Sequence, residues 1–238
     1  MLRPYRGAAQ INRMVPVRNI DLARRRLIGG SLALAALGAL PGTVAAEALR
    51  PTAAQSRGPF YPRNLPLEQD ADLARVAGAP GPAQGRIVHL FGRLRDESGR
   101  QVAGARVEIW QCNAFGRYHH PGDTSAQPLD PGFQGYGRAA ADAQGAYRFR
   151  TIKPVAYGSR APHIHFAVTP PGAGRSFITQ MYVAGEAANE RDFLLNGVRD
   201  PESRAALIVA LGSGEAIEPG TLAANFDIVL ARSAFGRA

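Results

Sequence analysis

The sequence predicts an all-β protein: an antiparallel β-sandwich with long loops and little helix, preceded by an export signal. Short runs rich in β-branched and aromatic residues recur along the chain, and turn-forming Gly, Pro, Asn and Asp separate them. No helical pattern is long enough for the crossovers that a parallel sheet needs, which favours antiparallel pairing. The predicted strands lie at residues 87–96, 105–112, 146–154, 163–170, 177–183 and 226–232.

An export signal is expected over residues 1–46. Arg24–Arg26 are followed by the uncharged run Leu27–Leu40 and then by the small residues Val44–Ala46. These are the basic, apolar and cleavage regions of a signal peptide, and the apolar run is short for a bilayer span. The arginine pair predicts the twin-arginine route, and hence a periplasmic protein with no stable membrane association after cleavage. The general export route, an uncleaved anchor and a start at Met14 remain open.

The charge of the chain is concentrated in this N-terminal segment. The whole sequence has 28 basic and 19 acidic residues, a net charge of +9, but residues 1–46 hold seven arginines and one acid. The mature chain is therefore close to +3, and its charge gives no support for a nucleic-acid partner. Cys112 is the single cysteine, which excludes an intramolecular disulfide and a metal site built from several cysteines.

The mature chain is expected to form one domain with an N-terminal extension. Residues 47–86 are rich in Pro, Gly and Ala, which predicts an ordered arm with little regular structure. Residues 87–238 carry the predicted strands and form the sandwich. Within them, Asp200, Pro201 and Glu202 supply a cap, a first-turn proline and an early acid, so a short helix or turn is expected near 200–207.

Two of the five histidines, His163 and His165, lie one residue apart in a predicted strand. Side chains alternate between the faces of a strand, so both imidazoles point to the same side and are able to bind one metal ion. This pattern is compatible with three interpretations: a metal site of two histidines and a carboxylate, a zinc site of three histidines, or a pair with a purely structural role. The next acid is Glu186, a whole strand further on, and His89 is expected on a strand surface. The other histidines are His119 and His120.

Two tyrosines suggest a better ligand set. Tyr157 lies just before the strand with the two histidines, and Tyr118 follows the end of another predicted strand. A phenol ordinarily ionises near pH ~10, but a trivalent cation stabilises the phenolate. Two phenolates and two neutral imidazoles suit Fe(III), a hard ion, better than zinc or copper.

Five motifs, in this order, resemble those of the intradiol ring-cleavage dioxygenases, most closely the iron-binding subunit type of protocatechuate 3,4-dioxygenase. The resemblance extends from GPFYP at 58–62 to about residue 183. The motifs are VEIWQCNAFGRY (107–118), LDPGFQGYGR (129–138), FRTIKP (149–154), RAPHIHF (160–166) and ITQMYV (178–183).

The resemblance implies a non-haem Fe(III) enzyme of aromatic catabolism. It would cleave a catechol-type ring between its two hydroxylated carbons with O2, to a cis,cis-muconate-type diacid. Tyr118 would be the equatorial tyrosinate and Tyr157 the axial one that substrate displaces, and His163 and His165 would be the imidazole ligands.

The resemblance also assigns Arg160 and Gln180. Arg160 would stabilise negative charge on the bound substrate, and Gln180 would line the same pocket. Only Gly158 and Ser159 separate Tyr157 from Arg160, where protocatechuate enzymes carry a longer insertion with a tryptophan. The helical N-terminal domain of catechol dioxygenases also has no counterpart here, so the identity of the catechol stays open.

The expected partners are therefore a catechol-type small molecule and O2, and a homo-oligomer is compatible with the sequence. A second interpretation is an exported, transthyretin-like β-sandwich binding module with a non-catalytic metal site. The strands at 87–112 fit both interpretations, whereas an arginine beside four ligands favours the enzyme.

Overall fold

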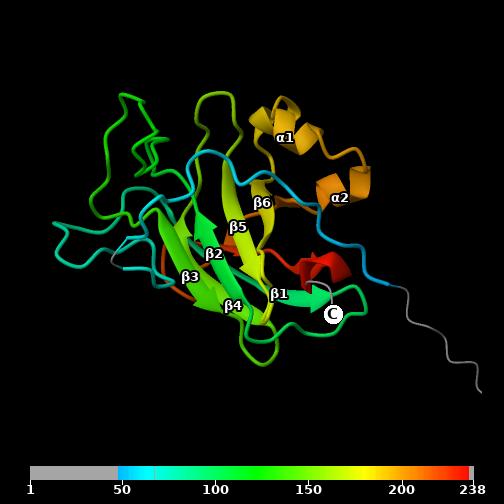
Figure 1. Ribbon diagram of the computed structural model, residues 1–238. Coiled ribbons are helices and arrows are strands. Elements are labelled where there is room, and N and C mark those ends of the chain that lie inside the picture. Colours follow the sequence, from blue (N-terminus) through cyan, green and yellow to red (C-terminus); the bar gives the residue numbers. More distant parts are fainter. Residues whose placement is uncertain (1–47, 67, 236–238) are drawn as a thin grey trace, which may run out of the picture. The chain divides into compact units, whose positions relative to one another are not determined.

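Two sheets of five strands each form the framework of the computed structural model, which describes residues 48–66 and 68–235 (Figure 1). The first sheet contains β1 (Ile87–Asp96), β4 (Ala146–Ile152), β8 (Gly212–Ser213), β9 (Leu222–Asn225) and β10 (Ile228–Leu230). The second contains, in spatial order, β3 (Tyr136–Ala140), β2 (Arg106–Trp110), β5 (His163–Thr169), β6 (Phe177–Val183) and β7 (Ile208–Val209). The predicted all-β class is thus confirmed, and the predicted export signal lies outside the described residues.

The helical segments are short. Three of them follow β6 and precede β7, near the end of the second sheet (Figure 1). Asp200 caps α2 by accepting a hydrogen bond from the backbone N–H of Ser203 at 2.9 Å, as its sequence pattern predicts. The segments are η1 (Ala187–Glu190), α1 (Phe193–Asn196), α2 (Pro201–Ala205) and η2 (Arg232–Phe235). Among the described helices, none has the length and apolar character to cross a bilayer.

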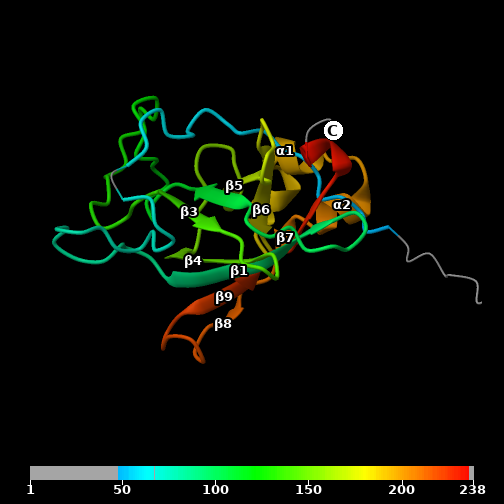
Figure 2. The same ribbon diagram turned by 60° about the horizontal axis from the view of Figure 1, so that its bottom comes forward.

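Both sheets are mixed, which corrects the prediction of purely antiparallel pairing. β1 pairs antiparallel with β4, but β9 and β10 lie parallel to it along its other edge (Figure 2). β7 also lies parallel to β6. Parallel neighbours need a long connection. Here the chain meets that need with irregular segments and whole strands rather than with long helices, so the sequence offers no crossover helix to signal these pairings.

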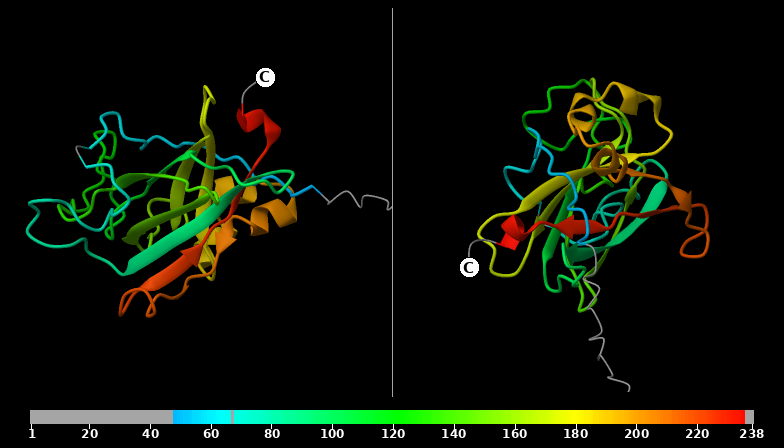
Figure 3. Two further views of the ribbon diagram at one scale, coloured as in Figure 1. Left: turned by 90° about the horizontal axis from the view of Figure 1, so that it is seen from below. Right: turned by 90° about the vertical axis from the view of Figure 1, so that its right-hand side faces the viewer.

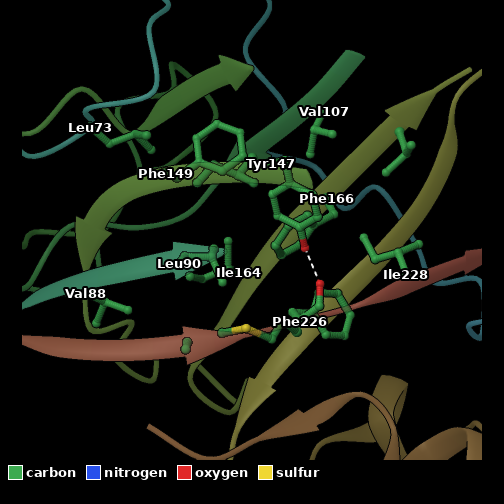
Figure 4. Close-up of a cluster of buried hydrophobic side chains, with 14 of the residues drawn as sticks. Leu73, Val88, Leu90, Val107, Tyr147, Phe149, Ile164, Phe166, Phe226 and Ile228 are labelled. Atoms are coloured by element: carbon green, nitrogen blue, oxygen red, sulfur yellow. Dashed lines mark hydrogen bonds between the residues drawn. The ribbon is translucent and has the colours of Figure 1, made fainter. Parts of the chain in front are cut away.

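A hydrophobic core fills the space between the two sheets (Figure 4). Phe166 of β5 packs against Tyr147 of β4 at a ring-centroid distance of 6.1 Å and against Phe226, between β9 and β10, at 5.1 Å. The Tyr147 hydroxyl donates a hydrogen bond to the Phe226 carbonyl oxygen (Figure 4). Since these side chains come from both sheets, the aromatic contacts bind the sheets together at their centre.

The second sheet is buried on its outer face as well. Trp110 and Tyr118 belong to a separate aromatic cluster there, and Phe60 and Tyr61 pack against it from the N-terminal side. Tyr61 donates a hydrogen bond to the buried carboxylate of Glu108 at 2.8 Å. Residues 48–86, blue to cyan in Figure 3, run past the sheets with a single bridge as their only strand-like pairing in the described chain.

A charged network fastens two irregular segments to the first sheet. Arg150 of β4 donates hydrogen bonds to Glu218 at 2.9 Å and to Asp72 at 3.1 Å. The Nε2 atom of His89 lies 3.1 Å from Glu218 as well. His89 is therefore 7% exposed rather than a strand-surface residue, because the segment that carries Glu218 covers it.

Replacement of Glu218 by Gln should reduce the acid sensitivity of the fold. Hydrogen bonds from Arg150 hold the pKa of Glu218 at about 2, below its ordinary value of 4.5. Because the folded-state pKa is the lower one, the carboxylate contributes stability above pH 4.5 that is lost as pH falls toward 2. Urea unfolding at several pH values should show a smaller loss for Glu218→Gln than for the wild type. Glu202→Gln, at an exposed ion pair, is the matched control, and equal acid loss in all three proteins would contradict the assignment.

Candidate metal centre

Strand β5 presents His163 and His165 on the outer face of the second sheet. Each is 1% exposed, and their Nε2 atoms lie 3.1 Å apart. Across the sheet, His165 is opposite both Gln180 and Trp110. The Trp110 ring stacks on the His165 ring at 4.8 Å with planes 5° apart, which fixes the orientation of that imidazole.

The surroundings of both imidazoles favour the neutral form that binds metals. The Nδ1 atom of His163 lies 2.6 Å from the Ala161 carbonyl oxygen, which can only accept. Nδ1 therefore carries the proton, and Nε2 has a free lone pair. Burial, and then the positive charge of Arg160, lower the pKa of His163 to about 4. The same causes, together with His163, lower the pKa of His165 well below its ordinary value.

Two tyrosines complete the group. The ring of Tyr118 lies 5.1 Å from that of Tyr157 and 6.4 Å from that of His165, and the Tyr157 ring lies 5.4 Å from that of His163. Tyr118 is 3% exposed, and its hydroxyl has no hydrogen-bond partner among the described residues. Burial raises the pKa of both phenols, and for Tyr118 the neighbouring Tyr157 adds to the effect. Neither phenol would ionise at neutral pH without a cation beside it.

Local turns position Tyr118 and Tyr157 beside the two histidines. The backbone N–H of Tyr118 donates to the carboxylate of Asp123 at 2.7 Å, which holds the loop after β2. The backbone N–H of Arg160 donates to the Tyr157 carbonyl oxygen at 2.9 Å, so residues 157–160 form a tight turn. Gly158 has a φ of +51°, a value that suits glycine. The short Gly158–Ser159 link thus keeps Tyr157 and Arg160 at the same site.

The donor set fits Fe(III). Within residues 48–66 and 68–235, no three His, Cys, Asp or Glu side chains are arranged to hold a metal, which removes the three-histidine and carboxylate readings there. What remains is the buried phenol of Tyr118 and the partly buried phenol of Tyr157, beside two imidazoles with converging Nε2 atoms. Two anionic oxygens and two neutral nitrogens match a hard trivalent ion.

Arg160 is buried beside this group and held by three side chains. Its Nε donates to Asp192 at 2.8 Å, and its Nη2 donates to Gln180 at 2.7 Å and to the Tyr182 hydroxyl at 3.0 Å. Gln180 in turn donates to the Ser56 carbonyl oxygen at 2.7 Å. The structure therefore brings together the six residues that the sequence singled out: Tyr118, Tyr157, Arg160, His163, His165 and Gln180.

Sequence reasoning missed Asp192 and Tyr182. Tyr182 lies two residues after Gln180 on β6 and so shares its face, a signal that period-2 alternation does contain. Asp192 precedes an apolar run and is recognisable as a helix cap, but its pairing with Arg160, 32 residues away, is a tertiary contact. Trp110, 1% exposed, belongs to the smaller of the two buried clusters and packs against His165.

Residues of the N-terminal segment pack against three of the four ligand candidates, Tyr118, Tyr157 and His165. Phe60 stacks on Tyr118 at 4.7 Å. Gly58 lies against His165 so closely that a Cβ there would be 3.2 Å from the imidazole Cε1. A cavity of about 460 Å3 borders Phe60, Tyr118 and His120, but the other three ligand candidates do not line it. This cavity therefore lies behind Tyr118 rather than at the centre of the group.

Comparisons with known proteins agree with this geometry. The family model described as Dioxygenase matches residues 56–232, which include every residue of the group. The protocatechuate 3,4-dioxygenase beta chain of Burkholderia cepacia is 40% identical over 169 residues, which are 68% of this chain and 71% of that protein. The chain belongs to the intradiol dioxygenase family. It is accordingly an oxidoreductase of the dioxygenase class.

Other members of the family are more distant. Hydroxyquinol 1,2-dioxygenase of Corynebacterium glutamicum is 32% identical over 162 residues, which are 60% of this chain and 50% of that protein. The structure of catechol 1,2-dioxygenase from Acinetobacter sp. ADP1 is similar with a TM-score of 0.58 and 28% identity, covering 76% of this chain and 63% of that one. The chain thus spans about half to two thirds of these two relatives.

Replacement of Gly58 by Ala should disturb His165. Gly58 has a φ of +68°, and Gly78, in the same segment, has a φ of +75° but nothing within 4 Å of an added Cβ. Both Ala variants should lose about 1 kcal/mol of stability from the strained backbone, but only Gly58→Ala presses on the imidazole. Iron bound per chain, measured after reconstitution, should fall for Gly58→Ala and stay at the wild-type value for Gly78→Ala. Equal iron content in the two variants would show that Gly58 does not constrain the centre.

Proposed function

We propose that this chain is an exported, periplasmic, non-haem Fe(III) intradiol dioxygenase. It would open a catechol-type ring between the two hydroxylated carbons with O2 and release a cis,cis-muconate-type diacid. The observation that carries the proposal is the buried, unpaired hydroxyl of Tyr118 beside two imidazoles whose Nε2 atoms converge. A buried polar atom without a partner is costly, and a bound cation would remove that cost.

Tyr118, Tyr157, His163 and His165 would hold the iron. Bound there, Fe(III) would supply the Lewis acid and redox partner that make an aromatic diol reactive toward O2. The residues suit this task because the two imidazoles are neutral and the two phenols need a strong positive charge to ionise.

The protein side chains would then manage protons and charge. Burial raises the pKa of Tyr157, so an ionised Tyr157 oxygen that no longer has a cation beside it would be a strong enough base to take a proton from a catechol hydroxyl. Arg160 carries a fixed positive charge beside the group and would stabilise negative charge that develops on the ring. Phe60 and Trp110 pack on Tyr118 and His165 and exclude water from that side.

The relatives and the family's chemistry support the proposed substrate class. The named relatives act on protocatechuate, hydroxyquinol and catechol, which share an aromatic ring with adjacent hydroxyls. An enzyme of aromatic catabolism that uses a catechol and O2 is therefore favoured over the transthyretin-like binding module. Relatives are named as alpha and beta chains, which supports an oligomeric enzyme.

Replacement of Tyr118 by Phe should strongly reduce both the iron colour and the activity. Phenolate bound to ferric iron absorbs visible light, so the reconstituted wild type should be coloured, and catechol added under nitrogen should shift the band. Tyr118→Phe should lose most of the band and at least about 100-fold in the rate of catechol-dependent O2 uptake, because a ligand is gone.

Tyr147→Phe is the matched control, because it removes a buried hydroxyl from the core rather than from this group. It should keep the colour and the uptake per folded protein. A wild type that is colourless, binds zinc in preference to iron and consumes no O2 with catechol, protocatechuate, hydroxyquinol or substituted catechols would refute the proposed function.

A further inference from the structure

Asp192 makes an unusual set of contacts for a helix cap. The residue is 0% exposed, and its two carboxylate oxygens have different partners. Oδ1 accepts from the backbone N–H groups of Leu194 and Leu195 at 3.1 and 3.0 Å, at the start of α1. Oδ2 accepts from Arg160 Nε at 2.8 Å and from the Ala161 N–H at 2.9 Å. One carboxylate therefore joins α1 to the segment that leads into the histidine strand.

The cap alone does not need this arrangement. A neutral Ser or Asn caps a helix about as well as Asp, and the cap of α2, Asp200, pairs with Arg50 in an exposed position. Burying an ion pair costs desolvation energy that the attraction between the charges often fails to recover. The Arg160–Asp192 pair, with side chains 9% and 0% exposed, is thus poorly explained by stability alone.

The contacts fix the guanidinium group of Arg160 in a defined orientation. Nε is held by Asp192, and Nη2 is held by Gln180 and Tyr182. The Phe193 ring lies 5.5 Å from Cζ and covers one face of the group. Nη1 makes no hydrogen bond to the described residues, which leaves its two N–H groups for a ligand. The adjacent residues Asp192 and Phe193 thus contact the same guanidinium group, Asp192 at Nε and Phe193 on one face.

We infer that Asp192 is a positioning residue for the dioxygenase reaction: its contact with Nε directs the free Nη1 end of Arg160 toward the substrate ring. The inference rests on the proposed function, because it concerns how Arg160 meets the substrate. Gln180 shares the task through Nη2, and the Ser56 carbonyl anchors Gln180 in turn. Pre-organised charge of this kind lowers the barrier without a cost of reorganisation during the reaction.

The test is a double-mutant cycle with Asp192→Asn, Arg160→Gln and the combination of the two. In the wild-type background, Asp192→Asn should lower kcat for the preferred catechol about 100-fold, the scale of loss for a misplaced catalytic group. In the Arg160→Gln background it should lower kcat less than about 2-fold, because the group that it positions is already gone. The visible iron band and the dissociation constant for catechol under nitrogen should change far less than kcat, since the four ligands are untouched.

Two further variants separate positioning from folding. Asp192→Ser keeps a side-chain acceptor for α1 and removes the charge, so it should reproduce the kcat loss if Asp192→Asn folds poorly. Asp200→Asn makes the same exchange at the cap of α2, and its kcat should equal that of the wild type. The inference is overturned if both Asp192 variants keep the wild-type kcat, or if they lose kcat equally in both backgrounds. A wild type that shows no catechol-dependent O2 uptake would overturn the proposed function, and the inference with it.

Discussion

The whole site depends on the burial of strand β5 on both of its faces. Ile164 and Phe166 point into the core between the sheets, and His163 and His165 point to the outer face under the N-terminal segment. A shift of register by one residue would exchange these sets, placing imidazoles in an apolar core and aliphatic groups at the site. The core therefore specifies the position of the histidines, although it makes no direct use of them.

The polar groups buried around Trp110 and Tyr118 need hydrogen-bond partners, and the carboxylates among them have such partners. The Glu108 carboxylate accepts from the hydroxyls of Tyr61 and Tyr136 at 2.8 and 2.6 Å, and Asp192 accepts four hydrogen bonds. The Tyr118 hydroxyl is an exception among the described residues, as are Trp110 Nε1 and His165 Nδ1. A buried phenol oxygen beside two imidazoles suits a positive partner. Because burial raises the pKa of this phenol, only a strongly charged cation beside it would allow it to ionise at neutral pH.

The sequence predicted the bounds of three strands, β1, β5 and β6, to within one residue, because turn-forming residues lie near their ends. β1 and β6 have the expected bounds of 87–96 and 177–183, and β5 ends one residue before the expected end. β3 was not predicted, since Tyr136–Ala140 contains Gly and Ala in place of β-branched residues, and it forms a strand because β2 pairs with it. The pairings of β9 and β10 with β1 were also not predictable, because they join segments more than 120 residues apart in the chain.

For the site, the sequence identified the side chains but not what holds them. Tyr118, His163 and Arg160 can be recognised from motifs, because chemistry restricts the residue types that serve there. Asp192 occupies a position where a cap is all that local reasoning requires, and only the fold shows that its second oxygen meets Arg160. Supporting residues of this kind escape prediction because their identity depends on a partner far along the chain.

The tight turn at residues 157–160 has a consequence for how the site meets its surroundings. Gly158 and Ser159 are exposed, and an added Cβ at Gly158 would meet nothing within 4 Å, so the turn builds no wall over the group. The aromatic side chains beside the site come from elsewhere. Phe60, from the N-terminal segment, packs on Tyr118 and Tyr157, and Phe193, 63% exposed and at the start of α1, packs on Arg160. The same two segments also hold Gln180 and Arg160 through Ser56 and Asp192. A change that moves the N-terminal segment or the start of α1 would therefore alter two things together: the side chains around the site and the orientation of the Arg160 guanidinium.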